Sequence, residues 1–365
     1  MHELAGLPLL GHALTTADSL GAAHVVAVIR HQKELVAEYI QNHFPQVLIA
    51  VQDEQPGTGR AVECALDALP DDFNGAVVVT SGDVPLLDVG TLEVLLDGHL
   101  SGGYSATVLS TILDDASGYG RIVRGSAGDF LEIVEHRDAS EDQLEITEVN
   151  AGVYVFDARH LREALKHVGS HNAQREKYLT DAAKQLLQAG HSAHAVIATD
   201  HWLVAGINDR VQLGEVSREL NRRICEAWQL AGVTILDPDT TWIDVTVQLS
   251  NDVVLYPGTY LRGLTKVDSG AEIGPEVVLE DTWVAENAKI IKSQAHAAKI
   301  GANATVGPFA YLRPGTDLGA DGKIGTFVET KNAVIGSGSK VPHLSYVGDA
   351  EIGEGSNIGA GTIFA

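Results

Sequence analysis

The stretch IDVTVQLSNDVVLYPGTYLRGLTKVDSGAEIGPEVVL (residues 243–279) carries an aliphatic residue at every sixth position. These positions are Ile243, Leu249, Leu255, Leu261, Val267, Ile273 and Leu279. A six-residue period is typical of a parallel β-helix, in which each hexapeptide forms one flat face of a triangular coil and its aliphatic side chain points inward. A β-sandwich would need a period of two and irregularly spaced turns. The stretch therefore predicts a solenoid of stacked coils.

The six-residue spacing continues toward the C-terminus after two slips, which are places where the spacing departs from six. It resumes in Ile300, Val306, Leu312, Leu318 and Ile324, then in Ile335, Val341, Val347, Ile352 and Ile358. Near one slip, Thr330 takes an aliphatic position and Lys331 follows it. Arg313, Lys331, His343 and Tyr346 recur at separations of 18, 12 and 3 residues, and 18 residues make one full coil.

These four side chains suit acetyl transfer to an amine. His343 would be the general base, Arg313 and Lys331 would bind a sugar phosphate, and Tyr346 would lie near the acetyl carbonyl. The alternative is that they are solvated surface residues without a shared role.

The first part of the chain alternates β-rich runs with helical ones. The runs HVVAVIR (24–30), QVLIAVQ (46–52) and GAVVVTSGD (75–83) each precede an amphipathic segment. Continuous apolar strands separated by helices predict an α/β, Rossmann-like fold with a mostly parallel sheet covered on both faces. Several strand-like runs follow over 105–158, then a helix over 179–190 with Thr180 or Asp181 as its N-cap.

A long helix is expected over 208–233, and we place the domain boundaries around it. The expected organisation is an α/β domain over 1–207, which the resemblance given below makes a nucleotidyltransferase domain, a linker helix over 208–233 and the hexapeptide-repeat domain over 234–365.

Motifs in the first domain suggest a nucleotide site. QDEQPGTGRAV (52–62) places Gly57 and Thr58 at a strand-to-helix turn, where backbone N–H groups can meet a base or phosphate. Asp83 follows a buried strand, at the position where open α/β sheets bind ligands, so it is either a Mg²⁺ ligand or a helix cap. Gly120, Glu135, Asn150 and Asn208 lie in later loops and suit sugar hydroxyls, although such residues also form ordinary turns.

Composition limits the possible partners. The formal net charge is −24 and the pI is near 4.9, without a Lys/Arg cluster, so binding to nucleic acid or to an anionic membrane is not expected. The two cysteines, Cys64 and Cys225, are too far apart in sequence for a metal or disulfide framework. We read a cytoplasmic protein with small-molecule substrates.

Taken in order, these motifs resemble the family of bifunctional N-acetylglucosamine-1-phosphate uridyltransferases and glucosamine-1-phosphate acetyltransferases. The resemblance covers nearly the whole chain, and the most specific stretches are GPFAYLRPG (307–315), FVETKNA (327–333), HLSYVGDAEIG (343–353) and NIGAGTI (357–363). A related sugar-nucleotide pyrophosphorylase with an acyltransferase-like tail is the next alternative, and HLSYVGDAEIG argues against it.

The resemblance implies a left-handed β-helix, a homotrimer and synthesis of UDP-N-acetylglucosamine for cell-wall precursors. In the first domain it implies UTP and N-acetylglucosamine 1-phosphate as substrates with Mg²⁺. The expected roles are nucleotide contacts by Gln52, Gly57 and Thr58, Mg²⁺ ligation by Asp83 and Asn208, and sugar binding by Gly120, Glu135 and Asn150.

In the second domain the resemblance implies acetylation of glucosamine 1-phosphate by acetyl-CoA. His343 would be the base, with glucosamine 1-phosphate held by Arg313, Lys331, Tyr346 and Asn357, and Ala360 would lie beside acetyl-CoA.

The chain departs from the family pattern at both ends. The family opens with a strand, a glycine-rich loop and a lysine before the motif that is His2 to Gly6 here, and it continues beyond GAGTI. We therefore expect a fragment, truncated at both ends, with both reactions impaired. The alternative is an inactive trimeric scaffold.

Overall fold

The computed structural model describes residues 1–170 and 172–365, which divide into two compact units. The first unit comprises Met1–His2 and Pro8–Gln212, and the second comprises Glu3–Leu7 and Leu213–Ala365. The three-part domain organisation expected from the sequence stays a prediction.

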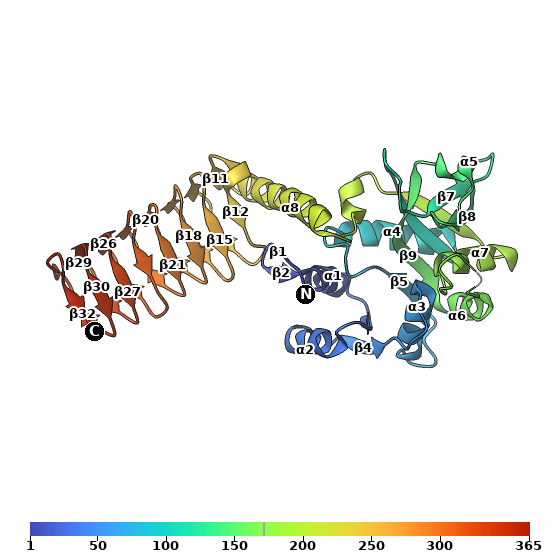
Figure 1. Cartoon of the computed structure of the whole chain (residues 1–365), viewed down its shortest axis with the longest axis horizontal. Helices are drawn as coiled ribbons and strands as arrows, with labels where there is room; N and C mark the ends of the chain where they lie inside the picture. The colour runs from blue at the N-terminus through green and yellow to red at the C-terminus, as the bar shows by residue number, and fades with distance from the viewer. Residues whose placement is uncertain (171) are drawn as a thin grey trace. The chain divides into compact units, whose positions relative to one another are not determined.

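The first unit alternates helices with strands through its first half (Figure 1). The short pair β1 (Glu3–Leu4) and β2 (Leu7–Pro8) belongs to the second unit, except for Pro8. The elements of the first unit begin with α1 (Leu9–Ser19), β3 (Val26–Ile29), α2 (Lys33–His43), β4 (Leu48–Val51), α3 (Thr58–Asp67), β5 (Ala76–Val79) and α4 (Val89–Gly102). Next come β6 (Ala106–Ile112), β7 (Arg121–Arg124), β8 (Phe130–Val134), α5 (Glu141–Leu144), β9 (Glu148–Asp157), α6 (Ala158–His167), α7 (Thr180–Gln188), β10 (Ala193–Ile197) and η1 (His201–Val204). The three β-rich runs read from the sequence are β3, β4 and β5.

The main sheet of this unit has six strands in the order β10-β6-β9-β7-β8, with β5 also paired to β9. β10 runs parallel to β6, whereas β9 is antiparallel to β5, β6 and β7, and β7 is antiparallel to β8. β3 and β4 form a separate parallel pair. The α/β fold is confirmed, but the sheet is mixed rather than mostly parallel, because β9 lies among its partners in the opposite direction.

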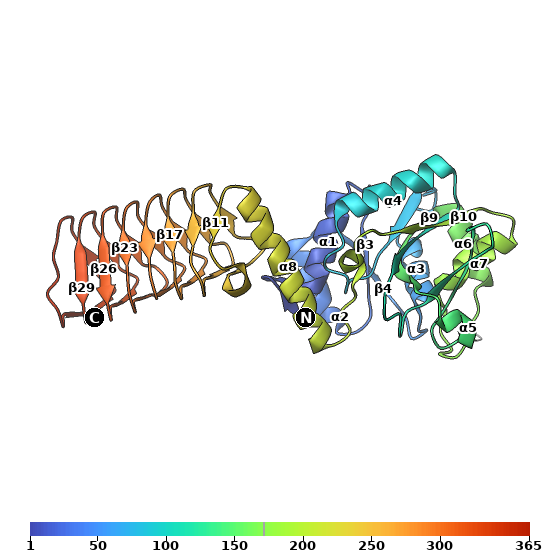
Figure 2. The same ribbon diagram turned by 90° about the horizontal axis from the view of Figure 1, so that it is seen from above.

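Helices cover both faces of the main sheet (Figure 2). On one face α3, α6 and α7 pack their apolar side chains around Phe156 of β9. On the other face α4 and η1 pack around Val153 and Val155 of the same strand. Side chains alternate along a strand, so β9 contributes to both cores.

Helix α8 (Arg210–Leu230) leads into a parallel β-helix built from three sheets (Figure 1). The β11 sheet contains β11 (Thr234–Ile235), β14 (Val254–Leu255), β17 (Glu272–Ile273), β20 (Lys289–Ile290), β23 (Thr305–Val306), β26 (Lys323–Thr326) and β29 (Lys340–His343). The β12 sheet contains β12 (Trp242–Ile243), β15 (Tyr260–Arg262), β18 (Val278–Glu280), β21 (Gln294–His296), β24 (Tyr311–Leu312), β27 (Glu329–Lys331), β30 (Tyr346–Gly348) and β32 (Ile363–Phe364). The β13 sheet contains β13 (Gln248–Leu249), β16 (Lys266–Val267), β19 (Trp283–Val284), β22 (Lys299–Ile300), β25 (Asp317–Leu318), β28 (Val334–Ile335) and β31 (Glu351–Ile352).

The six-residue rhythm accounts for this architecture. The aliphatic residues read from the sequence form one continuous core down the axis, in which Ile358 is partly buried and the others are buried. Thr330 is also buried in an inward position, where its hydroxyl lies 2.9 Å from that of Thr316. Two inward threonines hydrogen-bond to each other, so neither hydroxyl is left without a partner. The left-handed parallel β-helix is therefore confirmed.

The slips shorten individual coils without breaking the ladder. Tyr311 pairs with Glu329 at the full 18-residue spacing, whereas Val278 pairs with Gln294 and Glu329 pairs with Tyr346. The strands before and after each slip stay in register, so side chains on one wall remain aligned from coil to coil.

None of the described helices combines the length and apolar character that crossing a bilayer requires. Cys64 and Cys225 are both free thiols.

We predict that inward and outward positions of one strand contribute very differently to stability. In β28, Ile335 is 1% exposed and its neighbour Val334 is 50% exposed. Ile335→Ala should lower the free energy of unfolding by about 2–5 kcal/mol, because it leaves a cavity between coils. Val334→Ala should change it by less than about 0.5 kcal/mol. Urea denaturation followed by circular dichroism measures both, and equal effects would contradict the inward stacking.

Candidate functional sites

The nucleotide loop predicted at residues 52–58 connects β4 to α3. The Gln52 side-chain amide donates to the backbone carbonyls of Gln55 and Gly57, at 2.9 and 3.1 Å. Gly57 precedes α3 with a φ of 116°, a conformation that glycine adopts without steric cost. The structure thus brings Gln52, Gly57 and Thr58 together in one folded loop.

This loop is held against the segment 176–180. The Gly59 N–H donates to the Lys177 carbonyl at 2.8 Å, and the Leu179 N–H donates to Thr58 Oγ1 at 3.1 Å. A Cβ atom at Gly57 would lie 2.3 Å from the Lys177 carbonyl oxygen. The close approach of two backbones therefore requires glycine at position 57, a requirement that the sequence alone does not reveal.

Asp83 and Asn208 come together although they lie far apart in the sequence. The Ile207 N–H donates to the Asp83 carbonyl oxygen at 3.0 Å, which brings the segment that carries Asn208 beside Asp83. Asp83 is exposed, yet the protein around it removes part of its hydration and raises the pKa of its carboxyl group. Asp88, rather than Asp83, caps helix α4 by accepting the Thr91 N–H at 2.8 Å. The helix-cap alternative for Asp83 is therefore wrong.

Gly120, Glu135 and Asn150 form a second cluster at β7, β8 and β9. The Asn150 N–H donates to the Gly120 carbonyl at 2.8 Å, and a Cβ at Gly120 would lie 3.5 Å from a carboxylate oxygen of Glu135. The Asn150 amide donates to the Tyr154 hydroxyl at 2.7 Å and accepts the Gly152 N–H at 3.1 Å. Each end of that amide keeps one further hydrogen-bonding position for a ligand.

Two residues of this cluster escaped sequence reasoning. Tyr154 is buried, and burial raises the pKa of its phenol, so it stays protonated. Thr180 donates to Glu135 Oε1 at 3.1 Å instead of capping α7, so the expected Thr180 cap is wrong, as is Asp181, because Leu179 is the N-cap residue. The Thr180 contact has no local sequence signal, because it joins residues from different elements. Tyr154 lies four residues after Asn150 in the same strand, β9, where an aromatic residue in an apolar run predicts only a core position.

On the β-helix, Arg313, Lys331 and Tyr346 belong to successive coils of the β12 sheet. Tyr346 pairs with Glu329, and Arg313 Nη1 lies 2.9 Å from Glu329 Oε1. Lys331 Nζ lies 3.8 Å from a carboxylate oxygen of Asp349. Both ion pairs are substantially exposed, so each contributes little stability and can exchange its carboxylate for another anion.

His343 is exposed at the end of β29, directly before the corner that leads to Tyr346. Asn357 pairs with Lys340 on the neighbouring coil, and the Gly361 N–H donates to the Leu344 carbonyl at 3.0 Å. The position next to His343 on that coil is therefore Ala360. The structure places His343, Asn357 and Ala360 along one edge of the prism, adjacent to the wall that carries Arg313, Lys331 and Tyr346.

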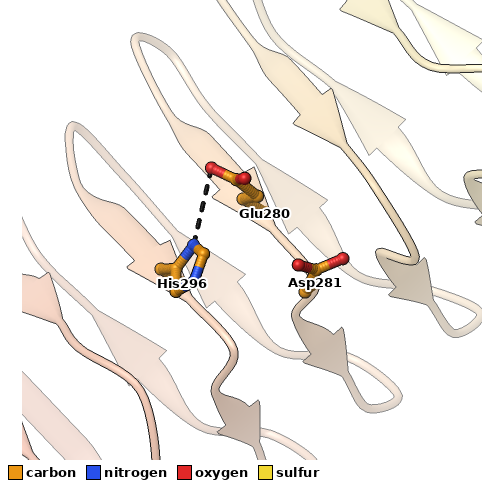
Figure 3. Close-up of side chains that lie close together, drawn as sticks. All are labelled: Glu280, Asp281 and His296. Carbon is orange, nitrogen blue, oxygen red and sulfur yellow. Dashed lines mark ion pairs between the residues drawn. The ribbon is translucent and has the colours of Figure 1, made fainter. Parts of the chain in front are cut away.

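A further group of potential ligands lies earlier on the β-helix (Figure 3). Glu280, Asp281 and His296 each offer one atom within 4.8 Å of the others, and His296 Nδ1 is 3.5 Å from Glu280 Oε2. One Asp281 oxygen already accepts the Leu264 N–H at 2.9 Å. Exposed carboxylates often lie beside histidine without a metal, so we assign no ion to this group.

Comparison with known proteins identifies the family of the chain. A family model described as nucleotidyl transferase matches residues 3–245. Proteins named "Bifunctional protein GlmU" match the whole chain: 58% identity in Clavibacter sepedonicus, 53% in Kineococcus radiotolerans and 52% in Mycolicibacterium smegmatis. The chain spans 74%, 74% and 76% of those relatives, respectively.

The chain belongs to the bifunctional GlmU family. It is therefore a transferase, and as a GlmU-type nucleotidyltransferase it uses a nucleotide and sugar phosphates. The family confirms the resemblance read from the sequence. The GlmU roles of the individual site residues remain predictions, which the geometry above makes specific.

We predict that the nucleotide loop of this GlmU chain tolerates no side chain at position 57. Gly57→Ala should weaken UTP binding by about tenfold or more, since the added methyl collides with the Lys177 backbone and alanine disfavours the positive φ. The matched control is Gly98→Ala in α4, where a Cβ meets nothing within 4 Å. Isothermal titration calorimetry reports both dissociation constants. Unchanged UTP affinity in Gly57→Ala would rule out this loop as the nucleotide contact.

Proposed function

We propose that this protein makes UDP-N-acetylglucosamine in two reactions on separate units. The β-helix acetylates glucosamine 1-phosphate with acetyl-CoA, and the α/β unit transfers a uridylyl group from UTP to the resulting N-acetylglucosamine 1-phosphate. The observation that carries the proposal is the alignment of Arg313 and Lys331 on one wall beside the exposed imidazole of His343.

In the acetylation, the phosphate of the sugar replaces Glu329 and Asp349 as the partner of the two cations. A phosphate dianion offers more charge and more acceptor oxygens than a surface carboxylate, which favours this exchange. The sugar amine attacks the thioester carbonyl, a C–N bond forms, the C–S bond breaks and CoA leaves as the thiol. His343 accepts the proton that the amine loses and passes a proton to the departing sulfur, and Tyr346 and Asn357 orient the sugar.

In the uridylyl transfer, a phosphate oxygen of N-acetylglucosamine 1-phosphate attacks the α-phosphorus of UTP and pyrophosphate leaves. Gln52, Gly57 and Thr58 hold the uridine nucleotide, while Gly120, Glu135 and Asn150 hold the acetylated sugar. The reaction needs positioning and charge neutralisation rather than a covalent enzyme intermediate.

Asp83 and Asn208 fit a magnesium site. They supply a carboxylate and an amide oxygen, which are the donors that Mg²⁺ takes from proteins. When bound, Mg²⁺ neutralises phosphate charge and orients the phosphates.

We also propose a homotrimer located in the cytoplasm. Phe309, Phe327 and Leu344 occupy one corner of successive coils, are 54%, 60% and 63% exposed, and all have positive φ. The two phenyl rings stack with their centroids 5.6 Å apart. Apolar side chains that gather on an exposed corner indicate a partner surface, which supports an interface between copies of the chain. The two free cysteines suit a reducing compartment.

We predict that the two reactions can be abolished one at a time. His343→Ala should reduce acetylation of glucosamine 1-phosphate by about 10²- to 10⁴-fold through loss of the general base. It should leave Mg²⁺-dependent formation of UDP-N-acetylglucosamine unchanged. Asp83→Ala should do the reverse. Release of CoA and formation of the nucleotide sugar are measured separately.

Each variant serves as the folding control for the other. Loss of both reactions in either variant would contradict two independent sites. Absence of both reactions in the wild-type chain would favour the alternative of an inactive trimeric scaffold.

We predict that a charge in the apolar corner separates the subunits. Phe327→Asp should shift the protein from trimer to monomer, because an ionised carboxylate cannot be buried at the interface without a partner. Leu264→Asp, at a more exposed corner of another coil, is the control and should remain trimeric. Sedimentation equilibrium distinguishes the two, and a Phe327→Asp trimer would place the interface elsewhere.

A further inference from the structure

The segment 177–180, which leads into α7, contacts the nucleotide loop through its backbone. The Lys177 N–H donates to the Pro56 carbonyl at 3.1 Å and its carbonyl accepts the Gly59 N–H. The Leu179 N–H donates to Thr58 Oγ1. Lys177 and Leu179 are both buried, and the Lys177 ammonium forms an ion pair with Glu63 of α3. The segment is thereby fixed to the loop proposed to hold the uridine nucleotide.

The next residue of the same segment contacts the sugar cluster. Thr180 is buried at the first position of α7, and its hydroxyl donates to Glu135 Oε1 at 3.1 Å. Glu135 directly follows β8, against which α7 packs (Figure 1). One short segment therefore joins the proposed nucleotide loop to the carboxylate proposed to bind the sugar.

The environment of Glu135 otherwise opposes an ionised carboxylate. Burial raises the pKa of its carboxyl group, and the hydrogen bond from Thr180 opposes that rise. The nearby carboxylates of Asp138, Glu176 and Asp181 raise the pKa further. Other titratable groups facing or adjoining this carboxylate are Tyr154, Tyr178 and His136. A carboxylate must stay ionised to accept hydrogen bonds with both oxygens.

We infer that Thr180 is a positioning residue for the uridylyl-transfer site, whose hydroxyl holds the Glu135 carboxylate in the orientation that accepts hydrogen bonds from the N-acetylglucosamine moiety. The inference rests on the proposed function and adds a residue to it. Thr180 acts through Glu135 and does not touch the substrate. The backbone of Lys177 and Leu179, which precede Thr180, is hydrogen-bonded to the nucleotide loop, so the Glu135 carboxylate is held at a fixed distance from that loop.

Equilibrium binding to the full chain tests this inference without relying on turnover. The dissociation constants of UDP and UDP-N-acetylglucosamine are measured by calorimetry. The dissociation constant of UDP divided by that of UDP-N-acetylglucosamine reports how much the sugar adds to the affinity. Thr180→Val, which removes only the hydroxyl, should reduce that ratio by about tenfold, as expected for a lost hydrogen bond to a charged group. UDP affinity should stay unchanged. Thr180→Ser, which keeps the hydroxyl, should restore the ratio.

The pH dependence gives a second readout. In the wild type the contribution of the sugar should fall as pH drops through the raised pKa of Glu135, because the protonated acid loses an acceptor. In Thr180→Val the loss of a hydrogen bond to the ionised form raises that pKa again. The decline should therefore begin at higher pH than in the wild type.

The controls separate this inference from the proposed function. Glu135→Gln should weaken the binding of UDP-N-acetylglucosamine without changing the affinity for UDP. If this variant binds UDP-N-acetylglucosamine as tightly as the wild type, both the sugar site and the role of Thr180 are overturned. An effect of Glu135→Gln together with wild-type behaviour of Thr180→Val would overturn the role of Thr180 alone. If Thr180→Val lowers the affinities for UDP and UDP-N-acetylglucosamine equally, and Thr180→Ser does not restore them, the role of Thr180 is merely structural. Thr180→Ala replaces the valine variant if valine disturbs folding, and the same criteria apply.

Discussion

Each coil of the β-helix exists because one aliphatic side chain per hexapeptide is buried against those of the coils above and below. No single coil can bury these side chains alone, so the coils fold together as one stack. Hydrogen bonding between paired strands sets the distance between successive coils. The consequence for function is alignment. Residues one coil apart occupy neighbouring places on the same wall, which brings Arg313 and Lys331 together although 18 residues separate them.

This constraint also explains which parts of the structure could be predicted from the sequence. The β-helix core followed from a local period, because inward positions recur whatever the rest of the chain does. The mixed sheet of the first unit did not, since the direction of β9 depends on non-local pairing with β5, β6 and β7. A strand buried on both faces is apolar whether it runs parallel or antiparallel to its neighbours, so its composition does not reveal its direction.

The candidate sites show the same division. Gly57 and Asp83 were identified by residue type after predicted strands, and the structure gathers them with their expected partners into separate clusters. Asn150 was identified by residue type in an expected loop, but it lies in β9, so the loop assignment is wrong. Thr180 was missed, because its significance lies in a contact with Glu135 from another element. Tyr154 was missed although it lies four residues after Asn150 in β9, because an aromatic residue in an apolar run predicts a core position rather than a site. Thr180 even carries a misleading local signal, since threonine before a helix usually predicts a cap. Its hydroxyl instead donates to the half-buried carboxylate of Glu135.

Both units solve a related electrostatic problem in a strongly acidic protein, which must bind anionic sugar phosphates. We propose that on the β-helix a pair of exposed cations, whose carboxylate partners can be displaced, binds the phosphate. On the α/β unit we propose that a backbone loop and a pair of oxygen donors suited to Mg²⁺ serve the same purpose. The most direct measurement is a crystal structure of the chain with glucosamine 1-phosphate and CoA. We expect the phosphate within hydrogen-bonding distance of Arg313 and Lys331, with the sugar amine beside the His343 imidazole. A sugar phosphate bound on another wall, away from His343, would contradict the account.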